Sequence, residues 1–248
     1  MSTTSVEPAT PTSHVPSRRT VLRAAAWTAP AVSVAVAVPA YAACSPTSAA
    51  PASYTLRWGA GTYTRSSAAS GSAVVPGSVV GAEPVNVTIT SSVSSTKVRR
   101  TAQNLAGSAQ GLELHHASAI TAGREHRQVV TFSFSREVTG LSFTIKDIDS
   151  DKDGWWDRVE LSGSRQATPR LRNGKDKGPY VVGSGVQGDP WHYYDGDTVL
   201  DNAGDTRGQV DVRYTEPVSV IALTYWSSVG GSNQRIWLSD FSFTASSC

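Results

Sequence analysis

The chain has 248 residues, and its 22 Lys and Arg against 20 Asp and Glu give a formal net charge of +2. Three Arg and one Glu fall in the first 43 residues, so the remainder has 19 basic and 19 acidic residues and no net charge. This balance excludes the strongly basic surface by which proteins bind nucleic acid or anionic membranes, and we expect neither partner.

The N-terminal segment has the order of a bacterial export signal. A polar start is followed by SRRTVL at residues 17–22, which resembles a twin-arginine motif, and then by an apolar run from Ala24 to Val38. The small-x-small pattern of a signal-peptidase site comes next, at residues 40–42. We expect residues 1–42 to be a twin-arginine signal peptide that is removed, and the mature protein to be secreted and extracellular. Nothing later in the sequence has the length and apolarity of a membrane span.

The two cysteines, Cys44 and Cys248, stand near the two ends of the expected mature chain. In an exported protein this placement favours a disulfide bond that joins the termini. Two separate thiols are the alternative. A lipid anchor on Cys44 is a further alternative, although Tyr41 stands where a lipid-attachment motif usually has an aliphatic residue.

After the signal, the composition and periodicity favour β-structure. Residues 43–53 are rich in Pro, Ala and Ser and predict a flexible tether, followed by one domain over residues 54–248. That domain alternates apolar and polar residues in short runs separated by turns, with no helical face and no strand–helix alternation. The predicted strands are Tyr54–Trp58, Val85–Thr90, Leu112–His115, Val129–Ser135, Leu141–Ile145, Arg158–Ser162, Val210–Thr215, Val218–Trp226 and Arg235–Phe243.

These strands predict an all-β fold, a single two-sheet antiparallel β-sandwich of jelly-roll type. Residues 136–140 and Glu216-Pro217 are predicted turns. Residues 163–205 are rich in Gly, Pro and polar residues and predict a long loop region, and loops of that length are usually functional or mobile. A bulge near Ser239-Asp240 would reconcile the change of parity along the last strand.

The segment DSDKDGWWDRVE, residues 149–160, matches the pattern of a twelve-residue calcium loop. A hard cation takes six to eight oxygens, and alternate carboxylates on a tight turn supply them. We expect Ca²⁺ to be the cofactor. The alternative is a solvated acidic hairpin loop, because the flanking residues have strand periodicity rather than helical faces. The expected ligands are Asp149, Asp151, Asp153, the Trp155 carbonyl, Asp157 and Glu160.

Aromatic residues stand beside carboxylates in and near this loop. Exposed aromatic rings stack on sugar rings, so these residues predict a surface that binds carbohydrate or a cell-surface glycan. The alternative is that the rings cap the core beneath the loops. The candidate ligand-binding residues are Trp155, Trp156, Trp191, Tyr193 and Tyr194.

Three stretches together resemble β-sandwich modules of secreted and surface-attached bacterial proteins. They are TFSFSREVTGLSFTIKDIDSDKDGWWDRVELSG, VDVRYTEPVSVIALTYWSS and IWLSDFSFTA, within residues 111–245. The resemblance implies a non-catalytic extracellular module, and Glu137 stands where such modules have Pro. We therefore expect a calcium-stabilised glycan-binding module of undetermined oligomeric state. The alternatives are a secreted polysaccharide hydrolase that uses two carboxylates, such as Glu113 or Asp195 with Asp197, and a structural envelope protein.

Overall fold

The computed structural model describes residues 50–59, 61–94, 104–116, 122–174, 178–200, 204–231 and 234–247, all within the compact unit Tyr41–Cys248. The predicted signal peptide, Cys44 and Cys248 lie outside the described residues. Export, the disulfide bond and the lipid anchor therefore stay predictions. Within the described ranges, no helix is long and apolar enough to cross a membrane.

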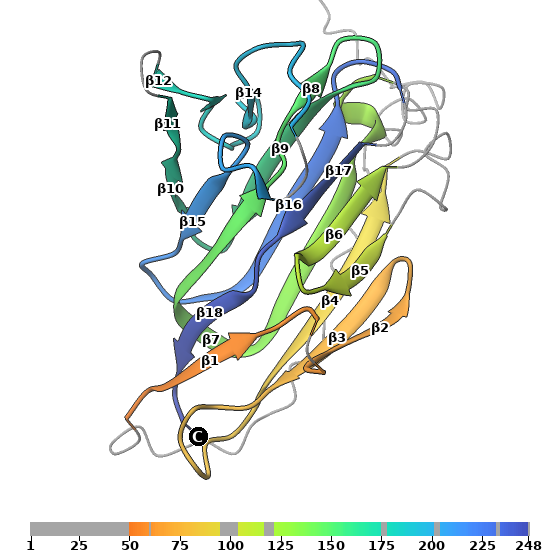
Figure 1. Cartoon of the computed structure of the whole chain (residues 1–248). Helices are drawn as coiled ribbons and strands as arrows, with labels where there is room; N and C mark the ends of the chain where they lie inside the picture. Colours follow the sequence, from red (N-terminus) through yellow and green to blue (C-terminus); the bar gives the residue numbers. More distant parts are fainter. Residues whose placement is uncertain are drawn as a thin grey trace, which may run out of the picture. The chain divides into compact units, whose positions relative to one another are not determined.

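The described elements are antiparallel β-strands joined by turns and loops, apart from one 3-10 turn, η2 (Arg124–His126). This confirms the predicted all-β class. Figure 1 shows their arrangement. The strands are β1 (Ala52–Leu56), β2 (Tyr63–Ser67), β3 (Ser70–Val75), β4 (Val85–Val93), β5 (Leu105–Ser108), β6 (Gly111–His116), β7 (Gln128–Lys146), β8 (Ser150–Asp151), β9 (Trp155–Gly163), β10 (Thr168–Leu171), β11 (Asn173–Gly174), β12 (Gly178–Pro179), β13 (Val181–Val182), β14 (His192–Tyr193), β15 (Val210–Arg213), β16 (Val218–Ser227), β17 (Gln234–Leu238) and β18 (Phe241–Ala245).

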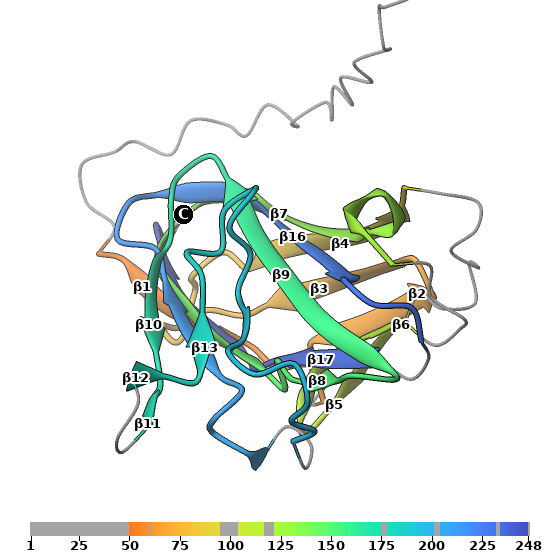
Figure 2. The same cartoon turned by 90° about the horizontal axis from the view of Figure 1, so that it is seen from above.

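Strand β7 belongs to two sheets. Its first half pairs with β4 on one side and β16 on the other, in the order β2-β3-β4-β7-β16-β9. Its second half pairs with β15 on one side, and with β18 and the end of β17 on the other. Strands β1, β5, β6 and β10 extend this second sheet. Figure 2, seen from above, shows the two layers, with β3, β4 and β16 in one and β5, β6 and β17 in the other.

The predicted turn at residues 136–140 is wrong, because β7 runs through it without reversing. Gly140 has a φ of 62°, a conformation that costs glycine little. At this glycine the strand can change direction and pass from one sheet to the other. The local polar residues therefore mark a change of sheet, not a hairpin.

Aromatic rings from the two layers meet in the core. Phe132 and Phe134, on the first half of β7, lie 5.2 and 5.5 Å from the ring centroids of Phe241 and Phe243 on β18. Phe143 stacks on Phe241 at 4.5 Å. The strand period of two directs these alternate residues inward. The face-to-face packing agrees with the expected two-sheet arrangement, while the jelly-roll type stays a prediction.

The last predicted strand is two strands. β17 ends at Leu238 and β18 begins at Phe241, so the chain is interrupted at Ser239 and Asp240, where a bulge was expected. The interruption restores Phe241 and Phe243 to the core.

The long region 163–205 contains more pairing than its composition predicts. β10 joins the second sheet by pairing with β15. Further along, the main chain of Trp191 forms an antiparallel bridge with Val159 of β9. Much of this region is therefore fixed against the sheets.

Candidate functional site

A hollow lies on the outer face of the second sheet, where β10, β15, β7 and β18 run side by side. We call it the outer-face groove. Its volume is about 520 Å³, within the range of ordinary ligand sites. The apolar residues Phe143 and Val212 point inward and are buried, so the residues beside them on the same strands point outward.

The strand registers place the outward side chains of the groove in two rows. In the first row, Arg213 pairs with Thr168 on one side and Ser142 on the other, and Ser142 pairs with Ser242. In the second row, Asp211 pairs with Arg170 and Thr144. Adjacent strands lie about 4.8 Å apart, so each row is a ladder of polar groups at that spacing.

Contacts within the second row fix its acceptor. The Thr144 hydroxyl donates to Asp211 Oδ1 at 2.9 Å, and Arg172 Nη2 lies 3.0 Å from Asp211 Oδ2. The Thr144 amide donates to the Ser239 hydroxyl at 2.8 Å, which adds Ser239 to the row. Asp211 is therefore held in place as an acceptor facing the groove.

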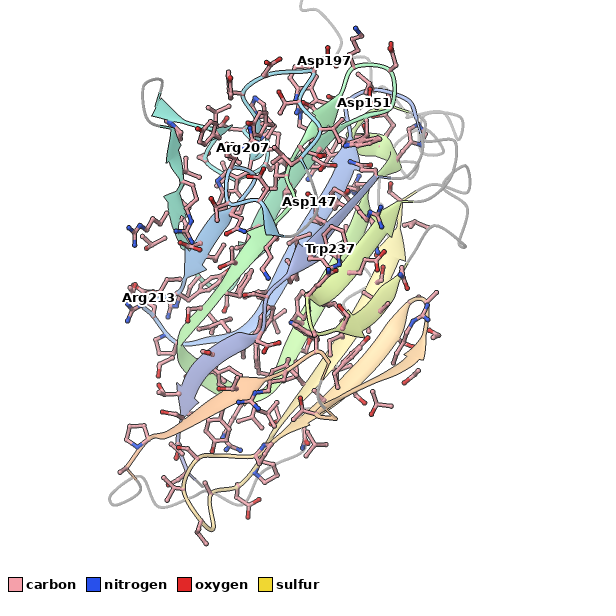
Figure 3. All side chains as sticks on the ribbon, in the orientation of Figure 1. Asp147, Asp151, Asp197, Arg207, Arg213 and Trp237 are labelled. Atoms are coloured by element: carbon pink, nitrogen blue, oxygen red, sulfur yellow. The ribbon has the colours of Figure 1, made fainter. Side chains whose placement is uncertain are left out.

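The groove also contains cations without carboxylate partners. Arg170 and Arg213 are exposed, and neither makes an ion pair within the described ranges. Figure 3 shows Arg213 projecting from the end of β15. The groove thus offers guanidinium donors, a carboxylate acceptor and hydroxyls that both donate and accept.

Sequence patterns did not identify this groove. Its residues come from four strands, and β10 lies in the segment expected to be a loop. The signal that was present is the polar parity of residues 142 and 144, and of residues 211 and 213, on strands whose other face is apolar.

The predicted calcium segment is a tight β-hairpin between β8 and β9. Ser150 pairs with Trp156 and Asp151 pairs with Trp155. The Gly154 amide donates to the Asp151 carbonyl at 3.0 Å and closes the turn. Figure 3 shows Asp151 near Asp197, at the end of the domain that carries the hairpin.

Asp149 and Asp157 are brought together in the interior. Asp149 accepts hydrogen bonds from Trp155 Nε1 at 2.5 Å and from the Leu200 amide at 2.9 Å. Asp157 is fully buried. Its Oδ2 accepts a hydrogen bond from the Asp149 amide at 3.1 Å.

The second oxygen of Asp157 is bound by two side-chain donors. The Tyr225 hydroxyl lies 3.0 Å from Oδ1, and Gln234 Nε2 lies 2.6 Å from it. Burial raises the pKa of Asp157 well above its ordinary value, and the nearby Asp149 charge raises it further. Burial also raises the pKa of Asp149, although its hydrogen bonds oppose the shift.

The other expected calcium ligands point elsewhere. Asp151 accepts from the Asp153 amide at 3.0 Å, and Asp153 lies exposed at the tip. Glu160 is bound by Arg124 in a two-oxygen contact of 2.7–3.0 Å and by the Gly188 amide at 3.3 Å. In the part of the chain that the structure describes, no three His, Cys, Asp or Glu residues are grouped so as to hold a metal. Calcium binding stays a prediction, and it would require these side chains to leave their present partners.

The expected aromatic residues differ in exposure. Trp191 and Tyr193 are 1% and 2% exposed, so they lie in the core, as the capping alternative expects. Tyr194 is 50% exposed. Trp155 and Trp156 are partly exposed, and Arg158 lies over the Trp156 ring at 4.2 Å. Tyr194, Trp155 and Trp156 therefore keep surface that a ligand can reach.

The carboxylates considered for hydrolysis lie in two places, with Glu113 on a strand and Asp195 and Asp197 together in one loop. Glu113 is on β6, where it pairs with Trp237 of β17. Asp195 and Asp197 are in the loop after β14, where Asp195 Oδ1 accepts from the Asp197 amide at 3.2 Å. Asp197 lies 3.6 Å from the Lys152 ammonium. These contacts explain the loop conformation without a reaction.

No family model, no curated protein and no solved structure matches this chain. The resemblance to bacterial β-sandwich modules therefore rests on the quoted sequence stretches.

The Arg124–Glu160 pair should stabilise the fold. Glu160 is 4% exposed, so Arg124→Ala would leave a buried charge without its strongest partner. We expect a loss of about 1–3 kcal/mol in the free energy of unfolding, measured by urea denaturation. Arg165→Ala is the control, because Arg165 and Glu216 form an exposed pair worth less than about 1 kcal/mol. Equal effects of the two substitutions would contradict a structural role for Glu160.

The Asp157 carboxyl should make stability depend on pH. Its pKa in the folded state lies above its ordinary value of 3.8, so the folded state keeps the proton to higher pH than the unfolded chain does. This contribution to stability is present at low pH and is lost as the pH rises through the folded pKa. Its full size is about 1.4 kcal/mol for each unit of difference in pKa.

Asp157→Asn removes this titration. The free energy of unfolding of the wild type, minus that of the variant, should be larger at pH 5 than at pH 8, as measured by urea denaturation in chelator. A difference that does not change with pH would mean that Asp157 titrates alike in the folded and unfolded chains.

Proposed function

We propose that this protein is a secreted, non-catalytic β-sandwich module that binds a carbohydrate chain in the outer-face groove. The observation that carries the proposal is the pair of polar rows across β10, β15, β7 and β18. The predicted signal peptide supports the extracellular location.

The chemistry of the groove suits a sugar chain. A carbohydrate presents hydroxyls that donate and accept at short, regular intervals, and the rows repeat at about 4.8 Å. Arg170 and Arg213 donate, Asp211 accepts, and Ser142 and Ser242 do both. Charges of both signs disfavour an apolar ligand or a polyanion.

The carboxylates of the groove favour binding over hydrolysis. A glycosidase needs one carboxyl group that gives a proton and a second that acts as a base or nucleophile. Asp211 is occupied by Arg172 and Thr144. Asp240 Oδ1 accepts from the Trp58 amide at 3.1 Å. Both contacts position the carboxylates as acceptors.

Arg213→Ala should weaken glycan binding. Arg213 is exposed and stands in the first row, so its removal takes a charged donor from the groove with little effect on the fold. After a glycan array has identified a ligand, we expect the Kd of Arg213→Ala to rise roughly tenfold or more in calorimetry.

The matched control is Arg65→Ala. Arg65 is exposed on β2, in the other sheet. The Kd of Arg65→Ala for the glycan should therefore equal that of the wild type. If no glycan binds, or if the two variants bind alike, the groove is not the site.

We keep calcium as a second part of the proposal. The buried carboxylates Asp149 and Asp157 have raised pKa values, and a divalent cation would favour their ionised forms. The cation would act by binding the folded hairpin, as the spacing of residues 149–160 predicts.

The test is thermal unfolding in chelator and then across a calcium titration. Tm should rise with the logarithm of the calcium concentration above Kd, with about 2.7 kcal/mol of stabilisation at a hundredfold excess over Kd. Asp151→Ala should abolish the rise, and Glu216→Ala, an acidic residue outside the hairpin, should retain it. A Tm that does not change with calcium would leave a hairpin held by its hydrogen bonds alone.

A further inference from the structure

The loop that leads from β13 into β14 (Figure 1) contains the one Asp-Pro bond of the sequence, Asp189-Pro190. A carboxylate can act as a nucleophile on a carbonyl group, and the side chain of Asp closes a five-membered ring when it attacks the carbonyl of its own residue. The nitrogen of proline leaves more readily than an ordinary amide nitrogen, because it is more basic. A Glu-Pro bond such as Glu216-Pro217 would need a larger ring.

Two backbone donors hold the carbonyl oxygen of Asp189. The Gly185 amide donates to it at 2.9 Å and the Ser184 amide at 3.2 Å. Gly185 has a φ of 74°, and a left-handed residue after its neighbour directs successive N–H groups at one point, an arrangement that binds anions. Donors aimed at a carbonyl oxygen stabilise the negative charge that develops there when the carbonyl carbon is attacked.

The Asp189 carboxylate lies on the same side as this carbonyl. The Ser184 amide also donates to Asp189 Oδ2 at 2.9 Å, so one N–H is shared by the side-chain and main-chain oxygens of a single residue. This sharing holds the carboxylate beside the carbonyl group that it would attack. Hydrogen bonds from Ser184 also lower the pKa of Asp189, so the nucleophile stays ionised at mildly acidic pH.

The proline side of the bond is fixed and open to water. His192 Nδ1 lies 2.9 Å from the Pro190 carbonyl oxygen, and the main chain of Trp191 forms its bridge with Val159 directly afterwards. Asp189 is exposed and Pro190 is partly exposed. The reacting groups are therefore held in place, while solvent can supply a proton and a water molecule.

We propose that the protein cleaves its own chain between Asp189 and Pro190. A carboxylate oxygen of Asp189 bonds to the Asp189 carbonyl carbon, and the Ser184 and Gly185 amides stabilise the negative charge on the carbonyl oxygen. The bond from this carbon to the Pro190 nitrogen then breaks, and the nitrogen keeps the electron pair and takes a proton from water. Water adds to the resulting cyclic anhydride and leaves two free carboxyl groups on Asp189. One water is consumed, and nothing is oxidised or reduced.

The cleaved chain should stay assembled. β13 and β14, on opposite sides of the break, pair with each other, and β16 pairs with β7 and β9. The fragments 43–189 and 190–248 therefore separate only after unfolding, and after reduction if the predicted disulfide bond forms. The reaction occurs once in each molecule and needs no glycan, so it is independent of the proposed binding function.

The first experiment compares the folded and unfolded chains. Mature protein is incubated at pH 5 and pH 8, with a sample unfolded in urea at pH 5, and the products are measured by mass spectrometry after denaturation and reduction. Cleavage at 189–190 should be at least about tenfold faster in the folded chain. It should also be faster at pH 5, because the leaving nitrogen must gain a proton. Equal rates in the folded and unfolded chains, or no cleavage, overturn the proposal.

Hydroxylamine tests the intermediate. It should capture the cyclic anhydride, so that part of the N-terminal fragment ends in Asp189 with a hydroxamate on its side-chain carboxyl group. Cleavage by a contaminating protease would leave that side chain unmodified. A fragment that never carries a side-chain hydroxamate overturns the proposed route.

The last experiment moves the reacting group. Asp189→Ala removes the nucleophile, and Asp189→Glu keeps the charge but enlarges the ring, so both should cleave at least about tenfold more slowly. The matched control is Glu216→Asp, which creates a second Asp-Pro bond in an exposed turn where, among the described residues, no backbone amide donates to the Glu216 carbonyl. This variant should cleave at 189–190 at the wild-type rate and at 216–217 at least about tenfold more slowly. Equal cleavage at the two bonds, or full cleavage in Asp189→Ala, overturns the proposal.

Discussion

The architecture depends on one strand serving two sheets. β7 packs Phe132 against Phe241 through its first half and Phe143 against the same ring through its second half. The period of two then fixes what faces outward, because Phe143 cannot stay in the core unless Ser142 and Thr144 leave it. Core packing thus determines which residues form the floor of the groove. The same packing positions the polar rows.

The same packing explains why an acidic segment is buried. β9 pairs with β16, so Asp157 lies across from Ser227 and enters the interior beside Tyr225 and Gln234. Burial of a carboxylate is costly unless donors surround it. The hydrogen bonds to Asp157 reduce this cost without removing it, as the raised pKa indicates. A cation and a proton would therefore each favour the folded hairpin, and the two would compete for the Asp157 carboxylate.

The sequence predicts the strands well where one face of a strand is buried and the other is exposed. Alternation located both arms of β7 and the return strands, but the residues between the arms have the composition of a turn, and only Gly140 in its left-handed conformation reveals a change of sheet. The site was largely hidden for two reasons. Its rows join strands distant in sequence, and β10 is too short to show a period. The sequence predicted an exposed ring at Trp191, because a single bridge to Val159 produces no alternation of apolar and polar residues in the sequence.

One wall of the groove, β10, depends on few contacts for its position. β10 pairs with β15 over four residues and has no other partner among the described strands. Pro169 at its centre lacks an N–H, which suits an edge strand and discourages a further strand from adding there. The edge therefore stays free of sheet extension, and Arg170 can face a ligand in the groove instead. Ligand binding would then depend on the position of β10, since a shift of this strand moves Arg170 relative to Asp211 and Arg213 in the groove.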